Sequence, residues 1–165
     1  LSLVYKVKDM KEEDFHKLAL VSGLLSSASS RLLMKKLRDE EEIVYSAFSS
    51  SHIRAGTLFI DCYINKNNKD LAMSKIKEVI SSLKDANFIK PFLDNIIERS
   101  RLNLLRLLDD KNILLDEVVV KTLGFDITNK EKHELIKNIS SEDISKFVDR
   151  LVLDTVYFLE EEEHE

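Results

Sequence analysis

Apolar and polar residues alternate along two stretches of the chain, residues 1–7 (LSLVYKV) and 57–64 (TLFIDCYI). Such alternation places every second side chain on one face and is typical of a β-strand. We expect the inward-facing residues to be Leu3, Tyr5 and Val7 in the first strand and Leu58, Ile60, Cys62 and Ile64 in the second.

Two further stretches have strand character, residues 42–48 (EIVYSAF) and the β-branched and aromatic residues 151–159 (LVLDTVYFL). The intervening SSSHIRAG has the composition of a turn. The strands over 42–48 and 57–64 are therefore predicted to form a hairpin through Gly56, with a connection longer than a tight turn.

Elsewhere the apolar residues recur with the period of an α-helix. Two pairs, Thr128 with Glu131 and Ser140 with Asp143, have the spacing of capping boxes and predict two helix starts. Further helices are predicted over residues 12–25 and, after a cap at Ser29 or Ser30, in the segment that precedes residue 42. Another is predicted over 70–83 after a cap at Asn68 or Asp70. Two more are predicted over 88–108, with Pro91 in the first turn, and over 113–123 before Gly124. On 70–83 the apolar stripe comprises Ala72, Ile76, Val79, Ile80 and Leu83.

The predicted order is a strand, two helices, a hairpin, a set of helices and a closing strand. This order indicates an α+β fold, with a largely antiparallel sheet and helices packed on one face. The length of 165 residues favours one domain. We assign residues 1–159 to that domain and residues 160–165 to an acidic tail.

Composition narrows the classes of function. The net charge is −5, and no stripe of basic residues interleaved with aromatics is present, so we expect no nucleic-acid partner. No apolar run approaches the roughly 20 residues of a membrane helix, and no signal-peptide pattern is present, so we expect no membrane partner. The single cysteine, Cys62, suits a reducing compartment, and we predict a cytoplasmic location. The sequence begins at Leu1, without an initiating methionine and directly in a strand-like pattern. We therefore expect it to be a piece of a longer protein.

The usual catalytic motifs are missing from the sequence. His133 and Glu134 would need a histidine at 137 to form H-x-x-E-H, and that position is Lys137. Three glycines are too few for a phosphate-binding loop. Cys62 lies among apolar residues that would bury it and raise its pKa. The chain is therefore not expected to bind a metal or cofactor or to be catalytic alone.

Two polar-tipped side chains, Arg38 and Tyr45, lie across the predicted junction between a helix and a strand. Tyr45 is expected to share a strand face with Ile43 and Ala47, which would point it away from Phe48. In a structural interpretation, Tyr45 packs in the sheet and Arg38 pairs with a neighbouring acid, either Asp39, Glu41 or Glu42.

The residues around this junction also carry a resemblance. Ser30-Arg31-Leu32-Leu33, Leu37-Arg38-Asp39 and Ile43-Val44-Tyr45-Ser46 resemble the signature of the C-terminal half of pitrilysin/insulinase-family zinc metallopeptidases, which include the mitochondrial processing peptidase. SSEDI and DTVYFL are similar to segments of a bacterial branch of that family. Two positions depart from the pattern: Glu42 replaces a common glycine, and a double glycine is reduced to Gly23-Leu24.

The resemblance implies a molecule of two similar halves that close around a chamber. One half carries H-x-x-E-H with zinc; the other lacks it and supplies an arginine and a tyrosine, matched here by Arg38 and Tyr45, that hold the substrate backbone. This chain is then the non-catalytic half of a metallopeptidase, with no cofactor of its own. Its partners would be a zinc-binding H-x-x-E-H half, upstream or in a separate subunit, and an unstructured peptide substrate. The alternative is a structural or interaction module on the same fold without a peptidase role.

Overall fold

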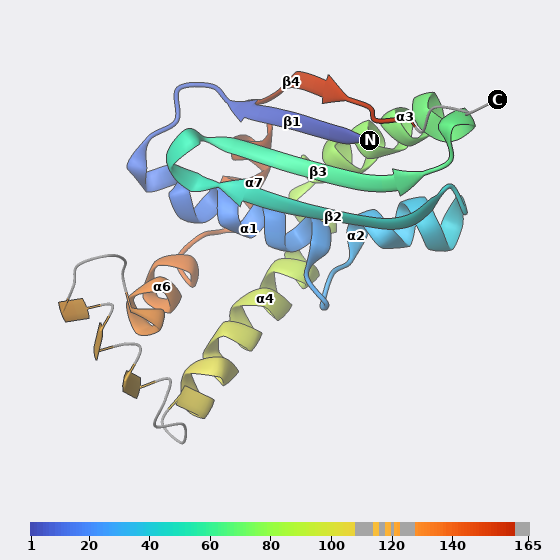
Figure 1. The fold of residues 1–165 in the computed structure, drawn as a ribbon. Coiled ribbons are helices and arrows are strands. Elements are labelled where there is room, and N and C mark those ends of the chain that lie inside the picture. Colours follow the sequence, from blue (N-terminus) through green and yellow to red (C-terminus); the bar gives the residue numbers. More distant parts are fainter. Residues whose placement is uncertain (108–113, 116–117, 120, 123–127, 161–165) are drawn as a thin grey trace.

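The computed structural model describes residues 1–107, 114–115, 118–119, 121–122 and 128–160. Four strands form one sheet in the spatial order β2-β3-β1-β4, and every neighbouring pair is antiparallel. The strands are β1 (Ser2–Val7), β2 (Val44–His52), β3 (Thr57–Ile64) and β4 (Leu151–Tyr157). Helices α1, α4 and α7 lie on one side of this sheet (Figure 1), so the predicted α+β architecture is confirmed.

The helices follow the predicted order. A 3-10 turn, η1 (Glu12–Asp14), leads into α1 (Phe15–Ser26), and the short α2 (Leu32–Met34) continues directly into a π-helical segment, η2 (Lys35–Glu40). After the hairpin come α3 (Lys69–Ser82), α4 (Ala86–Leu107), α6 (Asn129–Ile136) and α7 (Ser141–Val148), with 3-10 turns η3 (Ile53–Ala55) and η4 (Lys66–Asn68) flanking β3. Of the predicted helix over 113–123, residues 114–115, 118–119 and 121–122 are described and are helical. Its other residues lie outside the described ones, as do residues 161–165 of the predicted tail.

The core forms between the sheet and the helices that cover it. The predicted inward positions of β1 and β3 are buried, except that Ile64 is only partly so. The predicted stripe of α3 is buried as well. These apolar faces are removed from water together, which supplies the main driving force for folding. The fully buried side chains include Leu3, Leu18, Leu24, Leu25, Leu58, Ile60, Ile76 and Ile144.

Helix starts agree with the sequence in part. The Thr128 and Ser140 capping boxes both form. Neither Ser29 nor Ser30 caps a helix: α2 begins later, after Arg31 in the left-handed conformation (φ 46°), and the Ser30 hydroxyl donates to the carbonyl of Gly23. Helix α4 begins earlier than predicted because Asp85 accepts hydrogen bonds from the amides of its first turn, so Pro91 lies inside the helix.

The hairpin is longer than the sequence indicated. Residues 49–52, expected in a turn, continue β2 and pair with β3 as far as His52 opposite Thr57. The chain then reverses through η3 and Gly56, which has a φ of 63°. Glycine suits this position because it lacks the Cβ that makes left-handed backbone costly. The prediction of a hairpin through Gly56, with a connection longer than a tight turn, is confirmed.

Candidate functional site

Arg38 lies in the π-helical segment that ends the helix before β2. The widened backbone pattern includes hydrogen bonds from the Glu41 amide to the Lys36 carbonyl (3.2 Å) and from the Ile43 amide to the Leu37 carbonyl (2.9 Å). Such segments re-aim side chains and are frequent at functional sites. Here Leu37 is fully buried while Arg38 is exposed, so the buried neighbour anchors the backbone from which the guanidinium projects.

The Arg38 guanidinium has no hydrogen bond or ion pair within the described part of the chain. The two acids Glu40 and Glu41 pair with lysines instead. Glu41 pairs with Lys36 and Lys75, at 3.1 Å in each case, and thereby ties η2 to α3. Hydrogen bonds from Lys36 and then Lys75 hold the pKa of Glu41 below its usual range. The structural interpretation, in which a neighbouring acid neutralises Arg38, is therefore not observed.

Glu42 occupies a backbone position that explains the glycine in the family pattern. Its φ is 54°, in the left-handed region, and its amide donates to the Arg38 carbonyl at 3.2 Å. A residue with a Cβ is strained in this conformation, whereas glycine is not. The helix end is thus closed in the same way as a glycine would close it, and among the described residues the Glu42 carboxylate makes no ion pair with Arg38.

Tyr45 lies in a β-bulge at the start of β2. The register of β2 against β3 shifts between Val44 and Ser46, so Tyr45 is an extra residue. Its side chain is 69% exposed, and its hydroxyl donates to Asn65 Oδ1 at 3.3 Å. The bulge places Tyr45 on the outer side of the sheet, where its phenol is accessible.

The predicted facing of Tyr45 is wrong. Ile43 and Ala47 are each 7% exposed, whereas Tyr45 and Phe48 are both exposed. One inserted residue moves the side chains that precede it to the other face relative to those that follow. Strict alternation therefore fails at this point of the strand.

The segment between Arg38 and Tyr45 is held from both sides. The Ile43 amide bonds to the Leu37 carbonyl, and the Ile43 carbonyl accepts from Asn68 Nδ2 at 3.3 Å. Asn68 was expected to cap α3 with its side chain, but its amide braces this junction instead. Asn65 and Asn68 are two site residues that sequence reasoning missed, because only the β3–α3 connection brings them to β2.

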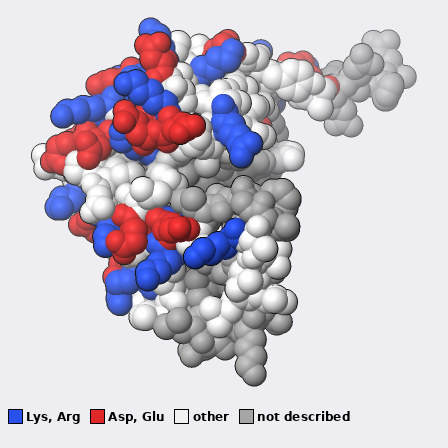
Figure 2. Space-filling model, turned by 90° about the vertical axis from the view of Figure 1, so that its left-hand side faces the viewer, with Lys and Arg blue, Asp and Glu red and all other residues white. Residues whose placement is uncertain are grey.

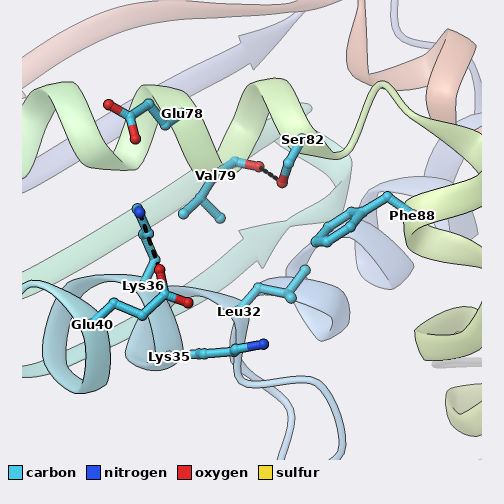
Figure 3. Close-up of a pocket in the computed structure, with 8 residues that line it drawn as sticks. All are labelled: Leu32, Lys35, Lys36, Glu40, Glu78, Val79, Ser82 and Phe88. Carbon is cyan, nitrogen blue, oxygen red and sulfur yellow. Dashed lines mark hydrogen bonds and ion pairs between the residues drawn. The ribbon is translucent and has the colours of Figure 1, made fainter.

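A hollow of about 300 Å³ lies beside the π-helical segment, between η2 and α3. Figure 3 shows Leu32, Val79 and Phe88 along it, with Lys36 turned toward Glu40. Arg38 and Tyr45 are not among its lining residues. The two predicted site residues thus lie on open surface rather than in this hollow.

The histidines and acids that the structure describes do not assemble into a metal centre. His133 lies on α6, and its Nδ1 is 3.2 Å from the Ser100 hydroxyl. Within the described ranges, no three His, Cys, Asp or Glu side chains form a candidate metal-binding group. On the face shown in Figure 2, acidic and basic side chains are interspersed. No described helix is long and apolar enough to cross a membrane.

Comparison with known proteins assigns the chain to a family. Residues 1–98 match the family model described as the peptidase M16 inactive domain. The chain belongs to this family. The chain is 25% identical over 149 residues to a probable inactive metalloprotease, YmfF, of Bacillus subtilis (strain 168), and the match covers 90% of this chain and 35% of that protein. The predicted resemblance to the non-zinc half of a metallopeptidase is confirmed.

Two solved structures share the fold of the M16 inactive domain. A protease from Helicobacter pylori matches with a TM-score of 0.73 and 18% identity over 91% of this chain and 37% of that one. A conserved protein from Enterococcus faecalis V583 matches with a TM-score of 0.68 and 19% identity, over 92% and 36% of the two chains. The chain therefore spans about a third of the length of these relatives.

Proposed function

We propose that this M16 inactive domain completes a peptide-binding chamber with a zinc-carrying half and supplies Arg38 and Tyr45 to hold the substrate. The observation that carries the proposal is the state of Arg38. Its guanidinium is exposed and, within the described chain, unpaired, although acids occupy all four following positions, 39–42. An arginine that is kept free of nearby carboxylates is available to a ligand.

The chemistry asked of the two side chains is hydrogen-bond donation. During hydrolysis of a peptide bond, negative charge develops on the carbonyl oxygen, and donors already aimed at that oxygen stabilise the transition state. The zinc site of the partner half supplies the activated water. In this chain the Arg38 guanidinium donates to the peptide backbone, and the Tyr45 hydroxyl does so by exchanging its hydrogen bond to Asn65 Oδ1 for one to the substrate.

Rigidity of the junction supports this role. Donors contribute most when they need no reorganisation as the reaction proceeds. The hydrogen bonds of Ile43 to Leu37 and Asn68 fix the backbone between the two side chains. Because both donors would hold backbone atoms rather than side chains, the substrate class is an extended, unstructured peptide of varied sequence.

The test is a reconstitution with the H-x-x-E-H half encoded in the same genome. Cleavage of an unstructured fluorogenic peptide is followed, and kcat/KM is compared for wild type, Arg38→Ala and Tyr45→Phe. Loss of one donor lowers the rate on the order of a hundred- to a thousandfold. Arg54→Ala is the matched control, because Arg54 is also exposed.

Binding of the two halves is measured in parallel by calorimetry, since an assembly defect would also abolish cleavage. The proposal predicts unchanged assembly for Arg38→Ala and Tyr45→Phe. Cleavage that survives Arg38→Ala at the wild-type rate would contradict it.

A second function is favoured by the description of the YmfF relative as a probable inactive metalloprotease. In that case the domain is a structural or interaction module without a peptidase role. The same reconstitution separates the two functions, because a structural module would assemble with its partner half yet leave peptide hydrolysis unaffected by both substitutions.

A further inference from the structure

The two edges of the sheet differ in how their backbone groups are satisfied. On β2, the Ala47 amide donates to Met34 Sδ (3.1 Å) and the Ser49 amide donates to the Ser26 hydroxyl. Side chains from α1 and α2 thus occupy amides that an added strand would need. Natural sheets cover their edges in this way to prevent pairing with other chains.

The opposite edge, β4, has no such cover among the described residues. Its pairing partner is β1 alone. In an antiparallel pair, alternate residues direct their backbone groups away from the neighbour, so about half of the β4 amides and carbonyls face outward. Besides its backbone pairing with β1, the polar contacts of β4 within the described chain are made by two side chains: the Thr155 hydroxyl donates to the Asp154 carboxylate, which forms an ion pair with Lys6.

Three of the apolar side chains of β4 are exposed. Val152 is 40% exposed, Val156 39% and Tyr157 59%. Val156 lies opposite Leu3, which is completely buried, so the helical layer that covers β1 does not extend over this part of β4. Valine and tyrosine are strong strand formers, and β4 contains no proline.

A hollow of about 530 Å³ adjoins the C-terminal end of β4. Its lining includes Phe48, Tyr63, Tyr157, Phe158 and Leu159, and Leu159 is 75% exposed. The one carboxylate of β4, Asp154, is paired with Lys6 at 2.9 Å. The hollow is also lined by Asp61 of β3. The strand β4 itself therefore offers apolar surface and no unpaired carboxylate, which suits an apolar polypeptide strand.

We infer that the β4 edge is the docking surface for the partner half, which adds an extended strand with alternating apolar residues to the sheet. The relatives that match this chain are about two and a half times as long, with 35–37% of their length covered. A large companion part is thus the occupant that the comparisons favour. The added strand would satisfy the outward backbone groups of β4 and place its apolar side chains against Val156, which shares the face of the buried Leu3.

This inference requires the partner half but not the role of Arg38 and Tyr45. The test uses the full chain and the H-x-x-E-H half from the same genome. Hydrogen exchange of the β4 amides is measured with and without the partner. We expect at least tenfold slower exchange over 151–157 on binding, and unchanged exchange over 44–52, where β2 is already covered.

The matched variants are Val156→Lys and Ser50→Lys. An inward-pointing lysine prevents edge pairing, because an added strand would bury its charge. Val156→Lys should raise the Kd for the partner at least tenfold, whereas Ser50→Lys, exposed on β2, should change it less than twofold. Thermal unfolding of both variants shows that the isolated chain remains folded.

Three results would overturn the inference. The partner half binds while β4 exchanges as fast as in the free chain; the partner half does not bind; or the free chain dimerises with β4 protected and the partner does not displace the second copy. Failure of the proposed function is separate, because Arg38→Ala leaves β4 protection unchanged whatever its effect on cleavage.

Discussion

The guanidinium of Arg150 lies 2.8 Å from the carboxylate of Asp14, across 136 positions of sequence. Arg150 also donates to the backbone carbonyls of Lys8 and Asp9, and Asp14 accepts further hydrogen bonds from Lys17 and from the Lys11 amide. Asp14 is only 1% exposed. The pair joins the turn before β4 to the start of α1 and closes that end of the fold.

Asp14→Asn should lower the free energy of unfolding by on the order of 3 kcal/mol, because it leaves Arg150 without its buried counter-charge. Urea denaturation at pH 7 measures the change. Glu13→Gln is the control, since Glu13 is well exposed and its loss should cost less than about 0.5 kcal/mol. Equal effects of the two substitutions would contradict the role of the pair.

The same carboxylate predicts a pH dependence. Burial alone would raise the pKa of Asp14, but hydrogen bonds from Arg150, Lys17 and the Lys11 amide outweigh burial and hold it below its usual value. Because the pKa is lower in the folded state, the ionised Asp14 stabilises the protein. This stabilisation is fully present above the ordinary aspartate pKa of about 3.9 and is lost as the pH falls through the lowered value. Asp14→Asn should therefore lose less stability than wild type on acidification below pH 4.

Glu42→Gly should stabilise the chain by about 1 kcal/mol, because Glu42 has a φ of 54° and glycine adopts this conformation without strain. Glu42→Ala separates the backbone effect from the charge. It keeps the Cβ and should stay within about 0.5 kcal/mol of wild type. Equal gains from both substitutions in thermal unfolding would show that charge removal, not backbone strain, is responsible.

Tyr5→Phe should leave stability unchanged or raise it by up to about 1 kcal/mol, because the buried Tyr5 hydroxyl has no hydrogen-bond partner among the described residues. Burial also raises the pKa of this phenol to about 12. Tyr5→Ala is the comparison: it removes a ring that is 4% exposed and should cost about 3–5 kcal/mol. A clear loss of stability in Tyr5→Phe would indicate a bound water that the hydroxyl needs.

Cys62 should be inert toward thiol reagents in the folded protein. Burial raises the pKa of its thiol to about 12, so the reactive thiolate is scarce at pH 8. Labelling with a chromogenic disulfide should be at least about a hundredfold slower in buffer than in 8 M urea. Folded protein that reacts as fast as unfolded protein would contradict the predicted role of Cys62 as a small buried core residue.

Local sequence patterns predicted much of the fold. The alternation in β1 and β3, the apolar stripe of α3 and the capping boxes at Thr128 and Ser140 were all predicted and are all present. Each depends on residues within a few positions of one another, so the chain itself contains the necessary information. The signature around Arg38 likewise indicated the family that the comparison confirmed. Whether Arg38 and Tyr45 hold a substrate stays a prediction.

Only the tertiary structure decided how those residues are presented. The extension of β2 to His52 and the bulge that turns Tyr45 outward depend on register against β3, which residues 42–48 do not encode by themselves. The braces from Asn65 and Asn68, the cover of the β2 edge by Met34, and the contact of Arg150 with Asp14 join positions far apart in sequence. Such contacts follow from how the layers pack, since side-chain hydrogen bonds between distant segments form only once the backbone has placed the groups within about 3 Å of each other.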